Sequence, residues 1–97
     1  MGDEQRLAIP TVQVGDDRFV VTEWRFPPGA ATGYHRHAHD YVVVPMTTGQ
    51  LEITGPDGSF VADLTAGSAY TRRTGVEHDV RNINDFEFVF VEVERKG

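Results

Sequence analysis

Short runs rich in valine, threonine, phenylalanine and tyrosine follow one another along the chain and are separated by turn residues. Such runs are typical of β-strands, and the helical spacing of apolar residues is missing throughout. Turns are predicted at Gly15-Asp16-Asp17, Pro27-Pro28-Gly29 and Pro56-Asp57-Gly58. The predicted strands are residues 9–14, 18–26, 33–37, 41–46, 50–54, 60–64, 69–73, 77–83 and 86–94. Many short strands with closely spaced turns predict an all-β sandwich or barrel.

The last predicted strand is apolar on both of its faces. Because successive side chains of a strand point to opposite faces, three phenylalanines share one face and three valines share the other. They are Phe86, Phe88 and Phe90 on one side, and Val89, Val91 and Val93 on the other. A barrel wall has only one inside, so the second face is expected to pack against another sheet or another subunit. We predict a homodimer of side-by-side barrels, with a sticky edge strand as the alternative.

One domain is predicted over residues 1–97, with residues 1–8 flexible and the barrel at about residues 9–95. No segment approaches the roughly 20 apolar residues of a membrane-spanning helix, and the first residues lack the apolar core of a secretion signal. A cytoplasmic location is therefore expected. Fifteen acidic against nine basic residues leave a net charge of −6, which argues against nucleic acid and anionic membranes as partners.

The composition also narrows the chemistry that this chain can support. The absence of cysteine removes disulfides, thiolate catalysis and sulfur ligands together. The single lysine, Lys96, lies next to the C-terminal residue, and neither Ser59 nor Ser68 lies in a nucleophile elbow. Any chemistry must come from histidine, tyrosine, arginine and carboxylates, or from a metal.

Three of the four histidines lie between Gly33 and Tyr41. On a strand, His35 and His37 share one face, and His39 joins them if no bulge intervenes. The fourth histidine, His78, lies in a distant segment. A His-x-His pair with a distant third histidine supplies three ligands to a metal and leaves other positions open. The predicted cofactor is a divalent transition metal (iron, nickel, zinc, copper or manganese), whereas hydrogen-bonded surface histidines are the alternative.

Glycines and histidines are spaced in two blocks. The first block runs through Gly29, His35, His37, Tyr41 and Gly49, with five, one, three and seven residues between them. The second block runs through Gly67, Arg73, Gly75, His78 and Asn82, with five, one, two and three residues between them. In this order the blocks resemble the two signature motifs of the cupin superfamily, and the resemblance covers residues 27–82.

This resemblance implies an all-β jelly-roll barrel of the double-stranded β-helix, RmlC-like type. In the family, the first motif supplies His, His and Glu to a metal and the second motif supplies the last His. The implied metal ligands of this chain are therefore His35, His37 and His78. Three neutral imidazoles leave the charge of a divalent ion uncompensated, which favours an anionic ligand in the open positions.

Three departures from the family pattern bear on the site. Tyr41 stands where the glutamate ligand is usual, and its hydroxyl, with a reference pKa of about 10, is expected to stay neutral and to face the substrate. Arg73 replaces the usual proline of the second motif. The first motif is one residue longer before Gly49, and a bulge near Pro45 is expected to absorb the extra residue.

The remaining candidates lie beside the histidines. His39 is a possible fourth ligand or a residue of the rim, and Asp40 could replace the missing glutamate only through a bulge. Strand alternation sends one of Arg72 and Arg73 inward, where a guanidinium would form a bidentate clamp for an anion. Ion pairs on the surface are the alternative for both arginines. The catalytic candidates are Tyr41, Arg72 and Arg73.

The resemblance implies a small metal-dependent enzyme similar to the dioxygenases of the family, with substrate on the open face of the ion. Close relatives look like short cupins linked to the degradation of β-alanine or similar amino and carboxylic acids, so the expected ligand is a small carboxylate. Two alternatives stay open: a non-catalytic module that binds or senses a small molecule, and zinc-dependent hydrolysis.

Overall fold

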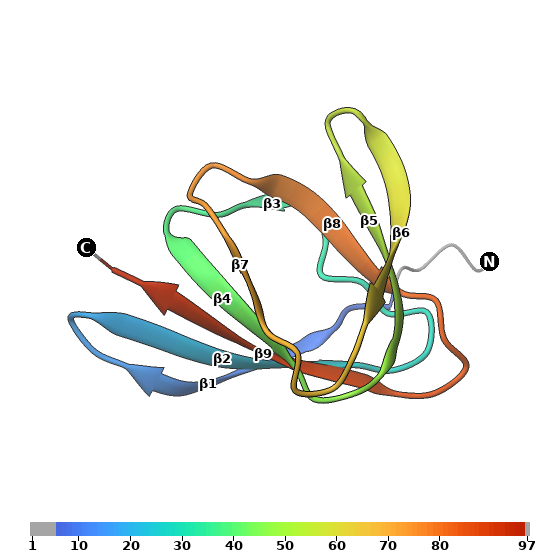
Figure 1. Ribbon diagram of the computed structural model, residues 1–97, viewed down its shortest axis with the longest axis horizontal. Coiled ribbons are helices and arrows are strands. Elements are labelled where there is room, and N and C mark those ends of the chain that lie inside the picture. Colours follow the sequence, from blue (N-terminus) through green and yellow to red (C-terminus); the bar gives the residue numbers. More distant parts are fainter. Residues whose placement is uncertain (1–5, 97) are drawn as a thin grey trace.

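The computed structural model describes residues 6–96, which contain no helix long and apolar enough to cross a membrane. These residues form two antiparallel sheets that face each other (Figure 1). The five-stranded sheet has the order β1-β2-β9-β4-β7, and the four-stranded sheet has the order β3-β8-β5-β6. The strands are β1 (Ile9–Gly15), β2 (Phe19–Phe26), β3 (His35–Arg36), β4 (Asp40–Pro45), β5 (Gly49–Gly55), β6 (Gly58–Leu64), β7 (Tyr70–Arg72), β8 (Glu77–Asn82) and β9 (Phe88–Arg95). The all-β prediction is confirmed.

The segment before β1 is held against the barrel as far as the structure describes it. Residues 1–5 of the segment expected to be flexible lie outside the described residues. Ala8 N donates to Ala31 O, and Ala31 N donates to Arg6 O, each at 2.9 Å. Ala8 and Ala31 are both buried. Residues 6–8 therefore form part of the packed structure.

The strand predicted at residues 33–37 is reduced to the two residues of β3. Gly33 takes a φ of 87°, in the left-handed region, which turns the chain just before the strand. His37 leaves the regular ladder but keeps two backbone bonds: its N–H donates to Val76 O, and its carbonyl accepts from Gly75 N, both at 2.8 Å. The end of β3 is therefore fixed although the strand is short.

The inner face of the five-stranded sheet changes from apolar to polar along its strands. Alternation along β9 turns Phe88, Phe90, Glu92 and Glu94 inward, and the first three are buried. Phe86 precedes β9, is 44% exposed and does not extend this row, which corrects the prediction for that residue. The buried core cluster consists of Ala8, Phe26, Ala30, Tyr41, Val43, Leu51, Leu64, Val80, Phe88 and Phe90.

Valines form a row on the outer face of the same sheet. The register pairs Val42 with Val93, Val93 with Val21, and Val21 with Val14. Val42 is 37% exposed and Val14 is 45% exposed. The second apolar face predicted for the last strand is therefore part of an apolar row that crosses β4, β9, β2 and β1.

The extra residue of the first motif lies in a turn, and the predicted bulge near Pro45 is absent, which corrects that expectation. β4 and β9 pair without a register shift as far as Pro45↔Phe90. The chain then turns through residues 46–48 before β5 begins at Gly49. Proline suits the last position of β4 because it has no N–H to donate to a ladder.

Candidate metal centre

Three imidazoles meet at one end of the space between the sheets. His35 in β3 lies directly opposite His78 in β8, and His37 follows β3. His37 Nε2 lies 3.0 Å from His35 Nε2 and 3.1 Å from His78 Nε2. The antiparallel pairing of β3 with β8 thus brings together the three histidines that the sequence analysis selected as ligands.

The hydrogen bonds around the rings indicate which nitrogens are free. His35 Nδ1 lies 2.8 Å from Gly33 O, and because a carbonyl only accepts, Nδ1 carries the proton. His35 Nε2 therefore presents a lone pair toward His37. His37 Nε2 carries at most one hydrogen and cannot donate fully to both of its neighbours. A cation among the three rings would satisfy the converging lone pairs.

The spacing of the three ring nitrogens fits a transition metal. Imidazole nitrogens held at right angles, about 2.1 Å from one ion, are about 3 Å apart. The two measured separations, 3.0 and 3.1 Å, agree with this value. The donor atoms of His35, His37 and His78 all lie within 4.8 Å of one another. The residues present are therefore a suitable ligand set for a divalent ion with further open positions.

Burial keeps two of these imidazoles neutral. Burial, and then the neighbouring His35 and His78, lower the pKa of His37 to about 4. Burial, followed by His35 and Arg72, likewise lowers the pKa of His78 to about 4. Metal binding requires neutral imidazole, so at pH 7 neither ring has to lose a proton before it can coordinate.

His37 is also supported on the side away from the other histidines. Its ring stacks on Tyr41, with centroids 3.8 Å apart and planes 19° apart. Glu94 Oε2 lies 3.9 Å from His37 Nδ1, which is longer than a hydrogen bond but within reach of an ion pair. His37 is only 5% exposed. These contacts hold the ring in the orientation that turns Nε2 toward the other two histidines.

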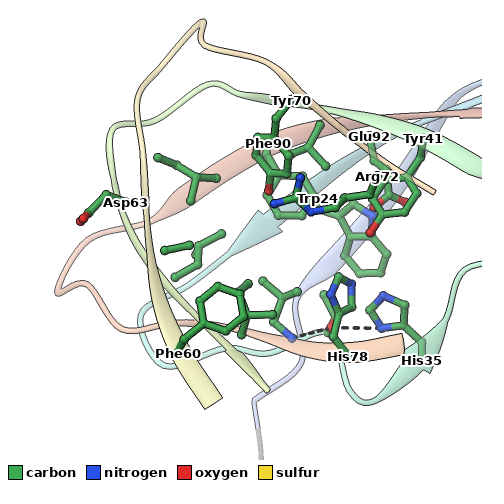
Figure 2. A pocket seen from close by; sticks show the side chains of 17 residues that line it. Trp24, His35, Tyr41, Phe60, Asp63, Tyr70, Arg72, His78, Phe90 and Glu92 are labelled. Carbon is green, nitrogen blue, oxygen red and sulfur yellow. Dashed lines mark hydrogen bonds between the residues drawn. The ribbon is translucent and has the colours of Figure 1, made fainter. Parts of the chain in front are cut away.

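A cavity of about 170 Å³ lies between the sheets, and predicted site residues from both sheets line it. His35 and His78 of the four-stranded sheet line one wall, and Tyr41, Arg72 and Glu92 of the five-stranded sheet line the other (Figure 2). Most of the remaining lining is apolar, including Leu51, Ile53, Val80 and Phe90, and Thr32 and Asp63 complete it. The cavity therefore places charged and polar groups opposite the imidazoles in a largely apolar space.

Two of the predicted catalytic residues lie in this cavity. Tyr41 is 3% exposed, and its hydroxyl is a buried group without a hydrogen-bond partner among residues 6–96. Burial, and then the charge of Glu92, raise the pKa of Tyr41 above its usual range, so the hydroxyl is neutral. Arg72 lies over the ring of Tyr70, with 4.6 Å between the guanidinium carbon and the ring centroid. Of the two arginines, Arg72 is the one that alternation turns toward the cavity.

The structure does not bring the other candidates to the cavity. Arg73 follows β7, is exposed and is not among the lining residues. His39 lies in a shallow outer hollow with Asp40 and Arg95, because the chain bends after His37 and breaks the strand alternation. Asp40 Oδ1 accepts a hydrogen bond from Thr74 N at 2.8 Å, away from the three imidazoles.

Two carboxylates near the site were missed in the sequence analysis. Glu92 lines the cavity and is 7% exposed, and burial, followed by the charge of Glu94, raises its pKa to about 7. Both residues follow Phe88 and Phe90 at alternate positions. That alternation could have revealed them, because a strand face that changes from aromatic to acidic residues inside a barrel marks a polar part of the interior.

The sequence matches the family described as Cupin domain over residues 22–94. The Beta-alanine degradation protein BauB of Pseudomonas aeruginosa PAO1 is 58% identical over 89 residues, which cover 92% of this chain and 94% of that protein. The name assigns a role in β-alanine degradation to the Pseudomonas protein.

Two solved structures show the same architecture. A cupin domain from Bordetella pertussis Tohama I is 59% identical, covers 99% of this chain and 100% of its own, and superposes with a TM-score of 0.97. A protein with a double-stranded β-helix domain from Klebsiella pneumoniae is 27% identical over 94% of this chain and 78% of its own, with a TM-score of 0.78. The predicted jelly-roll barrel is confirmed.

Proposed function

Because the chain belongs to the cupin family, we propose that it is a small metal-dependent enzyme whose three-histidine centre acts on a small carboxylate in a dioxygenase-like reaction. The observation that carries this proposal is the convergence of three ring nitrogens, 3.0 and 3.1 Å apart, beside a cavity between the two sheets. The Nε2 of a neutral His37 can pair with only one of its two neighbours, whereas a bound cation would satisfy the lone pairs of all three rings.

Each residue of the site has a role in this proposal. His35, His37 and His78 would hold the ion, which supplies Lewis acidity when it is bound. Arg72 attracts and orients a carboxylate from the opposite wall. The neutral hydroxyl of Tyr41 has no protein partner and is free to hydrogen-bond to the bound molecule. The apolar walls exclude water and so strengthen these interactions.

The cavity favours a small acid as the bound molecule. Its volume of about 170 Å³ is well below the roughly 300–1,000 Å³ of pockets that hold drug-sized ligands. Three neutral ligands leave the positive charge of a divalent ion to be balanced by the bound molecule. The similarity to the Pseudomonas relative, a β-alanine degradation protein, supports a carboxylate derived from an amino acid.

Elemental analysis of the purified protein tests the metal centre. We expect about one equivalent of a transition metal in the wild type and only traces in His35→Ala and His37→Ala, because each variant removes one of three protein ligands. His39→Ala is the control and should retain most of the metal, since His39 lies outside the cluster. A full equivalent in both ligand variants would contradict the assignment, and the element found will identify the metal.

Oxygen uptake distinguishes an enzyme from a binding module. The wild type, loaded with the metal that elemental analysis identifies, is incubated with a panel of small carboxylates, and oxygen consumption is recorded. Uptake that is lost in His78→Ala supports the dioxygenase-like reaction. Carboxylate binding without oxygen uptake, with the same affinity in wild type and His78→Ala, would instead establish a non-catalytic binding protein.

We also propose that the protein is a homodimer that buries the outer face of its five-stranded sheet. The valine row on this face, with Val42 and Val14 more than a third exposed, supports the proposal. Such a face in water costs free energy that a second copy of the same sheet would recover. The assembly would leave the cavity, which lies on the inner side of the sheet, intact.

A further inference from the structure

Two opposite charges line the cavity without pairing with each other. Arg72 and Glu92 both belong to its lining. Within residues 6–96 the side-chain ion pairs join Arg25 to two glutamates, and neither Arg72 nor Glu92 takes part in one. Figure 2 shows both side chains on the wall that faces His35 and His78. A ligand in the cavity therefore meets the guanidinium of Arg72 and the buried carboxyl group of Glu92, whereas the third charged lining residue, Asp63, is exposed and accepts a hydrogen bond from Gln50 Nε2.

The sheet register explains why these two groups remain apart. Arg72 pairs with Tyr41 and Glu92 pairs with Val43, so the two charges lie on β7 and β9, on either side of β4. Two strand spacings separate their backbones by roughly 10 Å. Tyr41, with its unpartnered hydroxyl, lies between them on β4. No ion pair joins the two side chains within residues 6–96, so each is available to a charged group of a bound molecule.

Within residues 6–96, no cationic side chain pairs with Glu92. A carboxylate that is 93% buried in an apolar cavity costs free energy unless a cation or a proton compensates it. Its pKa is raised to about 7 by burial and by Glu94, and the hydrogen bond from Trp24 offsets this rise only in part. An ammonium group next to Glu92 would stabilise the charged form, because an opposite charge within a few ångströms favours the ionised carboxylate.

We propose that the cavity recognises a short zwitterion, an ω-amino carboxylate whose ammonium is bound by Glu92 and whose carboxylate is bound by Arg72. This inference rests on the proposed function of the same cavity and adds a charge requirement to it. A simple carboxylate would leave Glu92 uncompensated, and a simple amine would leave Arg72 without an anion. The Tyr41 hydroxyl lies where it can hydrogen-bond to either end of the zwitterion.

Calorimetric titration of the full chain with three compounds of equal carbon number tests the proposal. The compounds are β-alanine, propionate and n-propylamine, which carry both charges, only the carboxylate and only the ammonium. We expect the wild type to bind β-alanine roughly ten- to hundredfold more tightly than either of the others. Equal affinity for β-alanine and propionate would overturn the proposal.

Two variants assign the ends of the ligand. Glu92→Gln should lower the affinity for β-alanine to that for propionate and leave propionate binding unchanged, which also shows that the variant is folded. Arg72→Met should weaken both carboxylates and leave n-propylamine unaffected. Glu52→Gln makes the same chemical change on a strand position that lies outside the cavity lining, and it should behave as the wild type.

A Glu92→Gln protein that still prefers β-alanine would overturn the role of Glu92, and unchanged carboxylate binding in Arg72→Met would overturn that of Arg72.

Metal analysis of the same samples separates this inference from the proposed function. Metal-loaded protein that shows no preference for the zwitterion would disprove the inference and leave the metal centre standing. A zwitterion preference that depends on Glu92 in protein that binds no metal would disprove the proposed function and support the inference.

Discussion

Tyr41 and Glu92 are two buried polar side chains that the protein leaves without the partners such groups usually have. Among residues 6–96, the Tyr41 hydroxyl has no hydrogen-bond partner, and no cationic side chain pairs with Glu92. Both residues face the cavity. Unpaired polar groups lower the free energy of unfolding, and they concentrate where a ligand completes their bonding. At the scale of the residue, the two groups that lower the stability of the protein therefore lie in the proposed binding site.

Replacing Glu92 by glutamine should change the pH dependence of stability. The folded-state pKa of Glu92 is about 7, above its ordinary value of 4.5, so the folded protein binds more protons than the unfolded chain between these pH values. The contribution of Glu92 to stability is fully present below pH 4.5 and is lost as the pH rises through 7. Glu92→Gln should therefore be more stable than the wild type by roughly 3 kcal/mol at pH 8, and little different at pH 4.

Urea unfolding at pH 4, 6 and 8 measures this difference. Glu52→Gln serves as the control and should follow the wild type at each pH. A Glu92→Gln protein whose advantage is the same at pH 4 and pH 8 would show that the carboxyl group does not titrate on folding in this way.

At the scale of the element, strand β8 carries one histidine of the candidate metal centre near its start and a buried asparagine at its end. His78 lies near its start, and Asn82 ends it, completely buried. The Asn82 amide donates to Phe26 O at 3.0 Å and to Phe86 O at 2.8 Å, and its Oδ1 accepts from Asn84 N at 2.8 Å. Asn82 thus ties the end of β8 to the ends of the five-stranded sheet.

Removing this amide should destabilise the fold strongly. Asn82→Ala leaves two buried carbonyls and one N–H without their partner, and we expect a loss of roughly 3 kcal/mol or more in the free energy of unfolding. Chemical denaturation provides the measurement, with Arg81→Ala, an exposed neighbour on the same strand, as the matched control. Equal midpoints for Asn82→Ala and Arg81→Ala would show that the bonds of Asn82 contribute nothing.

At the scale of the whole molecule, the two sheets contribute different parts of the site. The four-stranded sheet carries the imidazoles, and the five-stranded sheet carries Tyr41, Arg72 and Glu92 (Figures 1 and 2). The site therefore exists only when both sheets are packed together. The outer face of the five-stranded sheet, with its valine row, is the surface of the proposed dimer contact.

A single charge on this outer face should dissociate the proposed dimer. Sedimentation equilibrium should give twice the monomer mass for the wild type and the monomer mass for Val42→Glu, because a carboxylate cannot be buried in an apolar interface without a partner. Val61→Glu places the same charge on the exposed surface of β6, in the other sheet, and should remain dimeric. A monomeric wild type would disprove the dimer.

Local features of the sequence were enough to predict the fold and the histidines. Alternation and turn residues such as Pro56-Asp57-Gly58 are short-range patterns, and the strands follow from them. The histidine cluster was predicted from the His-x-His pair, the distant third histidine and the resemblance to the cupin motifs. The predictions that failed, a bulge near Pro45 and the extension of the phenylalanine row to Phe86, concern strand ends, where the chain can turn in more than one way.

The sequence by itself determined an all-β chain and the shared face of His35 and His37, because strand periodicity acts over a few residues, and the resemblance to the cupin motifs added His78. Only the tertiary structure decided that Arg72 lines the cavity, that His39 lies outside it, and that Glu92 shares it with the histidines. These positions depend on how β4, β7 and β9 pair and on how deeply each group is buried. Burial is a property of the assembled sheets, and it sets the charge state of Glu92 and the imidazoles, so no local pattern could contain it.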